Sequence, residues 1–240
     1  MEDISRKPRR LSVSAFFLII VSFYMVGSVM QNILATKTFG TPELSITTGG
    51  TIISWLVFLC MDVITEIWGR KRSIQCFWIS AALNLLISGI AWICIAIPGN
   101  NDFINGSYEV ILGTGWRIVI ASITAFLLGN YANTLIMYAM RVNSKNPNKT
   151  FGFVCRAVLS TLIGQLIDNG IFYLIAFAPI GIPATIEQSW MTILQLVGFT
   201  TAIETVVEAL VSPLTSLLVK YIKKLKIEEG VVTDIETGKE

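Results

Sequence analysis

The sequence predicts an all-α, polytopic membrane protein, and three observations support this fold class. Apolar residues make up 53% of the 240 residues and charged residues only 14%, against about 25% charged residues in soluble domains. The mean hydropathy is +0.68. Six stretches reach the roughly 20 apolar residues that a helix needs to cross a bilayer. We therefore expect one domain of six transmembrane helices over residues 1–222, followed by a polar cytoplasmic tail, residues 223–240.

The six expected spans are separated by residues that favour turns, such as Gly40-Thr41-Pro42 and Pro98 to Asn101. The first apolar stretch, at about 24 residues, exceeds the roughly 7 to 15 of a signal peptide, so we interpret it as an uncleaved span. The expected spans are Leu11–Leu34, Ser45–Trp68, Ile74–Ile97, Trp116–Met140, Phe153–Phe177 and Trp190–Val219.

The basic residues predict how the chain is oriented in the membrane. Fifteen of the 18 lysines and arginines fall at the N-terminus, in the second and fourth loops and in the tail. Because cytoplasmic loops carry the excess of basic residues, both termini are expected in the cytoplasm. Three spans per half are also compatible with a three-plus-three inverted repeat, a frequent plan among transporters.

The residue types present argue against an enzyme. The chain has no histidine, which excludes Ser-His and Cys-His nucleophile pairs and imidazole metal ligands. Its four cysteines have no C-x-x-C spacing, so we expect free thiols and no metal site. Hydrolase motifs and nucleotide-binding loops are absent from the sequence. We expect a protein that uses no cofactor and binds no nucleic acid, and whose partners are the lipid bilayer and a small-molecule substrate.

Ionisable residues inside the expected spans indicate a binding site. A charge at the bilayer centre costs about 2.5 kcal/mol or more, so such residues usually face a cavity or a partner. Asp62 and Glu66 lie four residues apart on one helical face, and Glu204 and Glu208 repeat this spacing. The fourth and fifth spans each carry a glycine, an amide and a second polar residue. These polar residues are Asn130, Asn133, Gln165 and Asp168. At 1.5 Å per residue, the residues expected near mid-membrane are Asn130, Gln165, Asp168, Glu204 and Glu208, with Asp62 somewhat nearer the cytoplasm.

Structural roles are the alternative for the same residues. The glycines and amides of the fourth and fifth spans would let those helices pack closely. Glu208 could shape the end of the last span together with Pro213. The carboxylates of the second span could instead lock the helices together through ion pairs. The available basic partners are Arg70, Arg72 and Lys37.

Four segments resemble the queuosine precursor transporter family, also called the vitamin uptake transporter family. Asp62 to Lys71, D-V-I-T-E-I-W-G-R-K, resembles its signature D-[IL]-[LIT]-T-E-x-[YFW]-G-[YR]-K. Asn32 to Lys37 resembles N-x-x-A-x-K, and Arg117 to Phe126 resembles R-x-x-x-A-S-x-x-A-F. Arg156 to Phe172 resembles R-x-x-x-S-T-x-x-x-Q-x-x-D-x-x-x-F. Together the matches extend over residues 32–177.

The resemblance implies a multi-pass importer of the bacterial inner membrane. Its substrates would be the 7-deazaguanine precursors of queuosine in tRNA: preQ0, preQ1 or queuine. This chain departs from the family where Asn130 and Asn133 replace an expected Gln and Asp, and where Glu204 replaces a frequent Lys. Because these changes fall at the depth of the expected site, the preferred ligand could differ from that of other members, for instance queuine.

The chemistry of a 7-deazaguanine fits these residues. Its adjacent N–H donors suit one carboxylate, Asp168 or Glu204, and its carbonyl suits the amide of Gln165 or Asn130. An additional carboxylate at Glu204 would favour cationic ligands. An aromatic slot for the flat ring could come from Phe172, Tyr173 or Trp55.

Two sets of candidate residues follow. The substrate-binding set is Asp62, Glu66, Asn130, Asn133, Gln165, Asp168, Phe172 and Glu204, and the gating or structural set is Asn32, Lys37, Arg117, Arg156 and Glu208. Alternating access about a mid-membrane site is the expected mechanism, with proton coupling, sodium coupling and facilitated diffusion all compatible. A substrate-capture subunit of an ATP-driven vitamin uptake system is the alternative function. A homo-oligomer is also compatible with the sequence.

Overall fold

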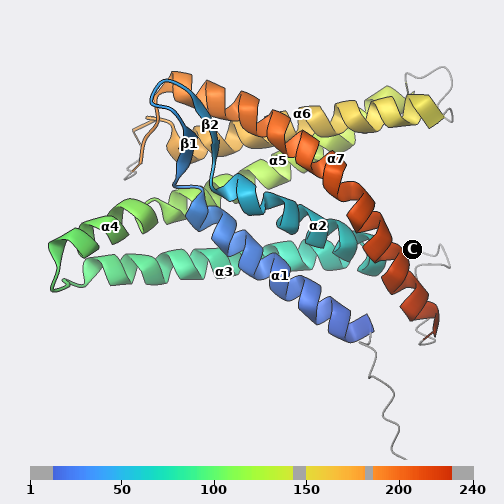
Figure 1. The fold of residues 1–240 in the computed structure, drawn as a ribbon, viewed down its shortest axis with the longest axis horizontal. Coiled ribbons are helices and arrows are strands. Elements are labelled where there is room, and N and C mark those ends of the chain that lie inside the picture. The colour runs from blue at the N-terminus through green and yellow to red at the C-terminus, as the bar shows by residue number, and fades with distance from the viewer. Residues whose placement is uncertain (1–12, 143–149, 182–185, 229–240) are drawn as a thin grey trace, which may run out of the picture.

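The computed structural model describes residues 13–142, 150–181 and 186–228. The structure is 83% helical, consistent with the expected all-α class, and its described part adds one short β-hairpin (Figure 1). The elements in chain order are α1 (Val13–Leu34), β1 (Thr38–Gly40), β2 (Ser45–Thr48), α2 (Gly50–Trp68), α3 (Arg70–Ala96), α4 (Asp102–Leu112), α5 (Gly115–Val142), α6 (Thr150–Phe177) and α7 (Trp190–Glu228).

Five stretches of the described helices are long and apolar enough to cross a membrane. They lie in α1, in α2, in α3, across α4 and the first part of α5, and in α7. The sixth expected crossing corresponds to α6, whose described apolar stretch is the shorter segment Thr161–Phe177. With 28 residues, α6 is about 42 Å long. The multi-span membrane protein is thus supported, and the sixth crossing and the orientation of the termini stay predictions.

The hairpin corrects the expected start of the second span at Ser45. Strands β1 and β2 pair antiparallel, because the β-branched residues of β2 favour a strand, and α2 begins only at Gly50. Gly40 turns the chain with φ 141°, and a Cβ there would lie 2.0 Å from the Leu44 carbonyl oxygen. Glycine is therefore required at this turn.

Helix α4 lies where only a loop was expected. The Asn101 side chain caps it by accepting a hydrogen bond from the Ile104 N–H at 3.1 Å. None of its residues is buried, and Phe103 is 83% exposed. Figure 1 shows α4 running beside α3 at one end of the molecule. The two helices therefore extend from the body as an apolar hairpin.

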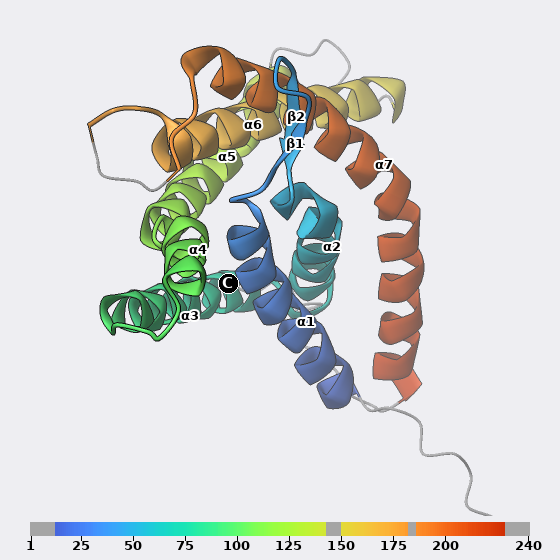
Figure 2. The ribbon, with the colours of Figure 1, turned by 60° about the vertical axis from the view of Figure 1, so that its left-hand side comes forward.

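Helix α7 connects the two ends of the fold. It contacts α6 and β2 as well as α2, and Figure 2 shows it following a curve along one side of the molecule. Pro213 lies inside it and cannot donate the usual hydrogen bond to the Ala209 carbonyl. The Ser212 hydroxyl donates to that carbonyl instead, at 3.4 Å. The helix therefore continues past Pro213, to Glu228.

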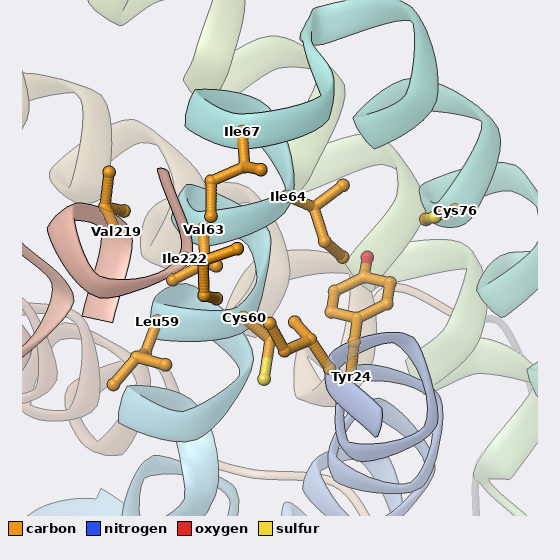
Figure 3. Close-up of a cluster of buried hydrophobic side chains, with 10 residues drawn as sticks. Tyr24, Leu59, Cys60, Val63, Ile64, Ile67, Cys76, Val219 and Ile222 are labelled. Carbon is orange, nitrogen blue, oxygen red and sulfur yellow. The ribbon is translucent and has the colours of Figure 1, made fainter. Parts of the chain in front are cut away.

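The apolar core consists of two clusters. The first cluster joins α1, α2, α3 and α7 (Figure 3), and its members include Tyr24, Leu59, Cys60, Val63, Ile64, Ile67, Cys76, Val219 and Ile222. The second cluster joins the end of α1 to α5, α6 and the start of α7. Its members are Ala35, Ile118, Ala121, Tyr173, Ala176, Phe177, Ala178, Ile193 and Leu196.

Polar residues occupy the level between these clusters. On α1, Asn32 lies between Tyr24 of the first cluster and Ala35 of the second. On α7, residues 200–208 lie between Leu196 and Val219 in the same way, and they include two glutamates. The fold thus sets one polar layer between two apolar ones, and this layer contains the candidate site.

Close packing of α5 on α6 positions one wall of that layer. A Cβ at Gly129 of α5 would lie 2.8 Å from the Asp168 Cβ and 3.2 Å from the Gly164 carbonyl oxygen. Such distances leave no room for a side chain, as the paired glycines of these spans predicted. Gly129 thereby sets how closely Asp168 approaches α5.

Replacing Gly129 by alanine should destabilise the protein by about 1–3 kcal/mol, the usual cost of overpacking. The matched control is Gly170→Ala on α6, where a Cβ would meet no atom within 4 Å. Thermal unfolding of the purified variants in detergent measures the difference. Equal melting temperatures for the two variants would contradict this account of the α5–α6 contact.

Candidate functional site

A cavity of about 310 Å³ lies in the polar layer, within the range of roughly 300 to 1,000 Å³ typical of small-molecule sites. Residues of α1, α2, α3, α5, α6 and α7 line it, together with Thr48 at the end of β2. Eight of the sequence-predicted residues are among them. These are Asn32, Asp62, Asn130, Gln165, Asp168, Phe172, Glu204 and Glu208.

The cavity is closed at one end and open at the other. Thr48, Thr51 and Ala35, at the hairpin end, are all less than 10% exposed. Asp62 and Asn130, at the other end, are exposed. A ligand would therefore enter and leave past Asp62 and Asn130 in this conformation.

Glu204 is the most deeply buried carboxylate of the site, at 6% exposed. One carboxylate oxygen accepts a hydrogen bond from the Asn169 amide at 2.9 Å, and the same amide donates to the Thr201 hydroxyl at 3.2 Å. Asn169 therefore orients Glu204 without neutralising its charge. Asn169 was not among the residues predicted from the sequence, although it is an amide inside a span and next to Asp168.

A second contact between α6 and α7 holds Glu208. The Gln165 amide donates to its carboxylate at 2.5 Å, and the Gln165 carbonyl accepts from the Thr205 hydroxyl at 2.6 Å. The Gln165 side chain is thus fixed at both ends of its amide. Thr205 was not among the predicted residues, because a hydroxyl can bond within its own helix, as Thr205 also does to the Thr201 carbonyl.

Asp62 and Asp168 line the cavity and have no hydrogen-bond donor among the described side chains. Within the described residues, no side chain donates a hydrogen bond to either carboxylate or forms an ion pair with it. Each carboxylate offers two oxygens that accept hydrogen bonds. These two side chains are therefore the groups most available to a ligand with N–H donors.

The cavity carries four carboxylates and, among its described lining residues, no lysine or arginine. The four interact electrostatically in a row: Glu204 acts on Asp168, Glu208 acts on Glu204, and Asp62 acts on Glu208. The described residues contain no group of three or more His, Cys, Asp or Glu placed to hold a metal ion. The arrangement suits an organic ligand that supplies donors or positive charge.

Aromatic side chains supply flat walls. Phe172 lines the cavity and packs edge-on against Tyr173, with ring centroids 5.2 Å apart. Phe77 and Phe126, which also line it, stack at 4.1 Å. Of the other two expected slot residues, Tyr173 is buried behind the wall, bonded to the Thr200 hydroxyl at 3.0 Å. Trp55 is 38% exposed and does not line the cavity.

Asn32 joins three helices rather than ending one. Its amide donates to the Asn84 side chain of α3 at 2.8 Å, and its carbonyl accepts from the Ser122 hydroxyl of α5 at 2.8 Å. Asn84 in turn donates to Ser28 of α1 at 3.2 Å. Asn84 was not among the residues predicted from the sequence, although an isolated amide in an apolar span is a signal of such a junction.

The hairpin closes the cavity by binding α7. The Ser45 N–H donates to the Gln195 side chain at 3.0 Å, and the hydroxyls of Thr47 and Thr200 bond at 3.0 Å. Thr48, which lines the cavity, contacts the Tyr173 hydroxyl at 3.4 Å. These contacts connect the closed end of the cavity to α6 and α7.

Glu66 and Lys37 lie away from the cavity, unlike Asp62. Glu66 forms an ion pair with Lys223 of α7 at 2.6 Å, and both side chains are about half exposed or more. Its partner is thus none of the basic residues named from the sequence. Lys37 lies over the Phe39 ring, 5.5 Å from its centroid. Of the two carboxylates of the second span, Asp62 therefore lines the cavity and Glu66 forms a surface ion pair.

Arg117 has a structural environment. It is 1% exposed, and its guanidinium donates to the carbonyls of Ile175, at 2.5 Å, and Ala178. It also lies 3.9 Å from Glu187. These carbonyls lie at the end of α6, so Arg117 satisfies acceptors that the helix leaves open. The side chains of the predicted residues Asn133 and Arg156 lie outside the described part of the structure.

The expectation of free thiols agrees with the described cysteines. Cys60 and Cys76 are free and buried, and Cys94 is free and exposed. Cys60 and Cys76 belong to the first apolar cluster, where a thiol packs as a small apolar group.

Comparison with known proteins identifies one family. A family model described as putative vitamin uptake transporter matches residues 48–218, well over half of the 240-residue chain. No curated protein and no solved structure matches. The matched region contains α2 to α6 and most of α7. It includes Asp62 and all the cavity-lining carboxylates and amides of α6 and α7 named above, Gln165, Asp168, Asn169, Glu204 and Glu208.

Replacing Arg117 by lysine should lower the amount of protein in the membrane and its melting temperature. A single ammonium cannot serve both carbonyls in the fork geometry of a guanidinium. The control, Glu187→Gln, removes the contact with the 43% exposed Glu187 carboxylate and leaves both carbonyl contacts of the buried Arg117 in place. Membrane abundance and thermal unfolding are the readouts. A lysine variant as stable as the native chain would show that the carbonyl contacts carry little energy.

Proposed function

The chain belongs to the putative vitamin uptake transporter family, and we propose that it imports queuosine precursors across the bacterial inner membrane. The substrates would be 7-deazaguanine bases such as preQ0, preQ1 and queuine. The observation that carries the proposal is the mid-layer cavity, which is lined both by the Asp168 carboxylate, with no hydrogen-bond donor among the described side chains, and by the Phe172 ring. The family motif at Asp62 to Lys71 supports the same assignment.

Asp168 is better suited than Glu204 to hold the edge of the base. A 7-deazaguanine presents N1–H and N2–H donors side by side, which one carboxylate can accept together. No described side chain donates to Asp168, whereas Glu204 already accepts from Asn169. Asp168 therefore takes the base edge, and Glu204 lies beside it.

The carbonyl of the base needs a donor, and Gln165 can provide one. An amide NH₂ carries two hydrogens, and the contact to Glu208 uses one of those on Gln165. Gln165 lies three residues before Asp168 on α6, which places both on one helical face. Phe172 lies four residues after Asp168, so the same face supplies carboxylate, amide and ring.

Transport would proceed by alternating access about this cavity. The cavity is closed at the hairpin end and open past Asp62 and Asn130. With both termini in the cytoplasm, as the basic residues predict, this conformation faces inward. An outward conformation would release the hairpin and close the opposite end. Proton or sodium coupling and facilitated diffusion differ in whether the ligand accumulates in proteoliposomes above its external concentration.

Complementation tests the function. This chain is expressed alone in bacteria that neither make queuosine precursors nor have their own importer, and each precursor is supplied at low concentration. A salvage enzyme is supplied with queuine. The expected result is queuosine in tRNA with at least one precursor. No queuosine despite confirmed membrane expression would contradict an autonomous importer, and recovery only with an ATP-driven partner would identify a substrate-capture subunit.

In the same assay, Asp168→Asn should abolish uptake of every precursor while the protein still accumulates in the membrane. The substitution keeps the shape and removes the charge and one acceptor of the base edge. Glu66→Gln is the control, because its carboxylate lies outside the cavity in an exposed ion pair worth less than about 1 kcal/mol. Loss of uptake in the control alone would reverse the assignment of these two carboxylates.

A further inference from the structure

We propose that Asp62 and Glu208 form a cation subsite that selects ligands carrying an ammonium group. The preferred substrates would then be 7-deazaguanines with an aminomethyl substituent, primary or secondary, over the neutral nitrile. This inference rests on the proposed function, since it takes the cavity as the transport site. Beyond that function, it specifies the charge of the preferred substrate and the residues that recognise this charge.

The charge balance of the cavity is the first support. Two of its four carboxylates, Glu204 and Glu208, accept hydrogen bonds from the neutral amides of Asn169 and Gln165. Glu204 is 6% exposed, and no lysine or arginine is among the described residues that line the cavity with it. Charges buried in a protein are normally paired. The missing positive charge is therefore expected to arrive with the ligand.

The carboxylates lie at two levels, which gives them different roles. Asn169 holds Glu204 at one level, beside Asp168. Gln165, four residues earlier on α6, holds Glu208 at the other level, beside Asp62. Glu204 and Glu208 are four residues apart on α7, which separates the levels by about 6 Å along the helix. This separation is comparable with the width of a bicyclic base.

A base bound by its edge at Asp168 would therefore extend its substituent toward Asp62. An ammonium has hydrogens to donate and no acceptor. Asp62 has no described donor, and Glu208 accepts only from Gln165 among the described residues. Both carboxylates can accept from the ammonium in charge-assisted hydrogen bonds. A nitrile offers only an acceptor there and would meet two negative charges.

The subsite is tested by measuring ligand affinity with isothermal titration calorimetry on the purified full chain in detergent. The ligands are the aminomethyl base and the nitrile base, in choline chloride. We expect the amine to bind about 10- to 100-fold more tightly, the ratio that a hydrogen bond between charged groups supplies. Asp62→Asn and Glu208→Gln should bring this ratio close to one. Glu66→Gln, one turn from Asp62 on the same helix, should leave it unchanged.

Four other outcomes would contradict the cation subsite or the proposed function. Equal or tighter binding of the nitrile to the native chain would mean that the carboxylates need no cation from the ligand. If both variants keep the native ratio of amine to nitrile affinity, residues other than Asp62 and Glu208 select the ammonium group. Competition by sodium chloride that is lost in Asp62→Asn would assign the subsite to an inorganic cation. If neither base binds, the proposed function itself fails. If the chain restores queuosine in tRNA but binds the amine and the nitrile with equal affinity, only the cation subsite is ruled out.

Discussion

Contacts between α6 and α7 through two amide side chains are the interactions on which the site depends. Polar groups inside membrane-spanning helices must find partners within the protein, because lipid offers none. Here Asn169 binds Glu204 at 2.9 Å and Gln165 binds Glu208 at 2.5 Å. Neutral amides orient the carboxylates and leave their charge in place. This is why the polar layer can be both a helix contact and a binding surface.

The rest of the fold holds this layer in position. The second apolar cluster and the Arg117 contacts fix one end of the α5–α6 pair, and Gly129 lets α5 approach Asp168. The first cluster anchors α2 and the far part of α7. The hairpin then closes one end through Gln195 and Thr200. Apolar packing above and below thus leaves a cavity whose walls are polar.

Much of the fold follows from the sequence, because long apolar runs can form only helices in a membrane. The ranges expected for α3, α5 and α6 agree with the structure to within a few residues, apart from the first turns of α3. The hairpin was missed because its threonines adjoin the apolar run of α2. Helix α4 was missed because its 11 residues are too short for a span and carry acidic residues.

The candidate site was predictable where several spans carried polar residues at one depth, as with Asp168 and Glu204. Spacing alone could not separate Asp62 from Glu66, since both lie on one face of α2. Their different environments arise because Lys223 of α7 reaches Glu66. The roles of Asn84 and Asn169 became recognisable only from their partners in the structure, Asn32 and Glu204.

The most direct measurement of the central claim is an experimental structure of the full chain with an aminomethyl 7-deazaguanine bound. The account predicts the base in the cavity with its donor edge on Asp168 and its ammonium near Asp62. A base bound outside the α2, α6 and α7 wall, or with its edge away from Asp168, would contradict it.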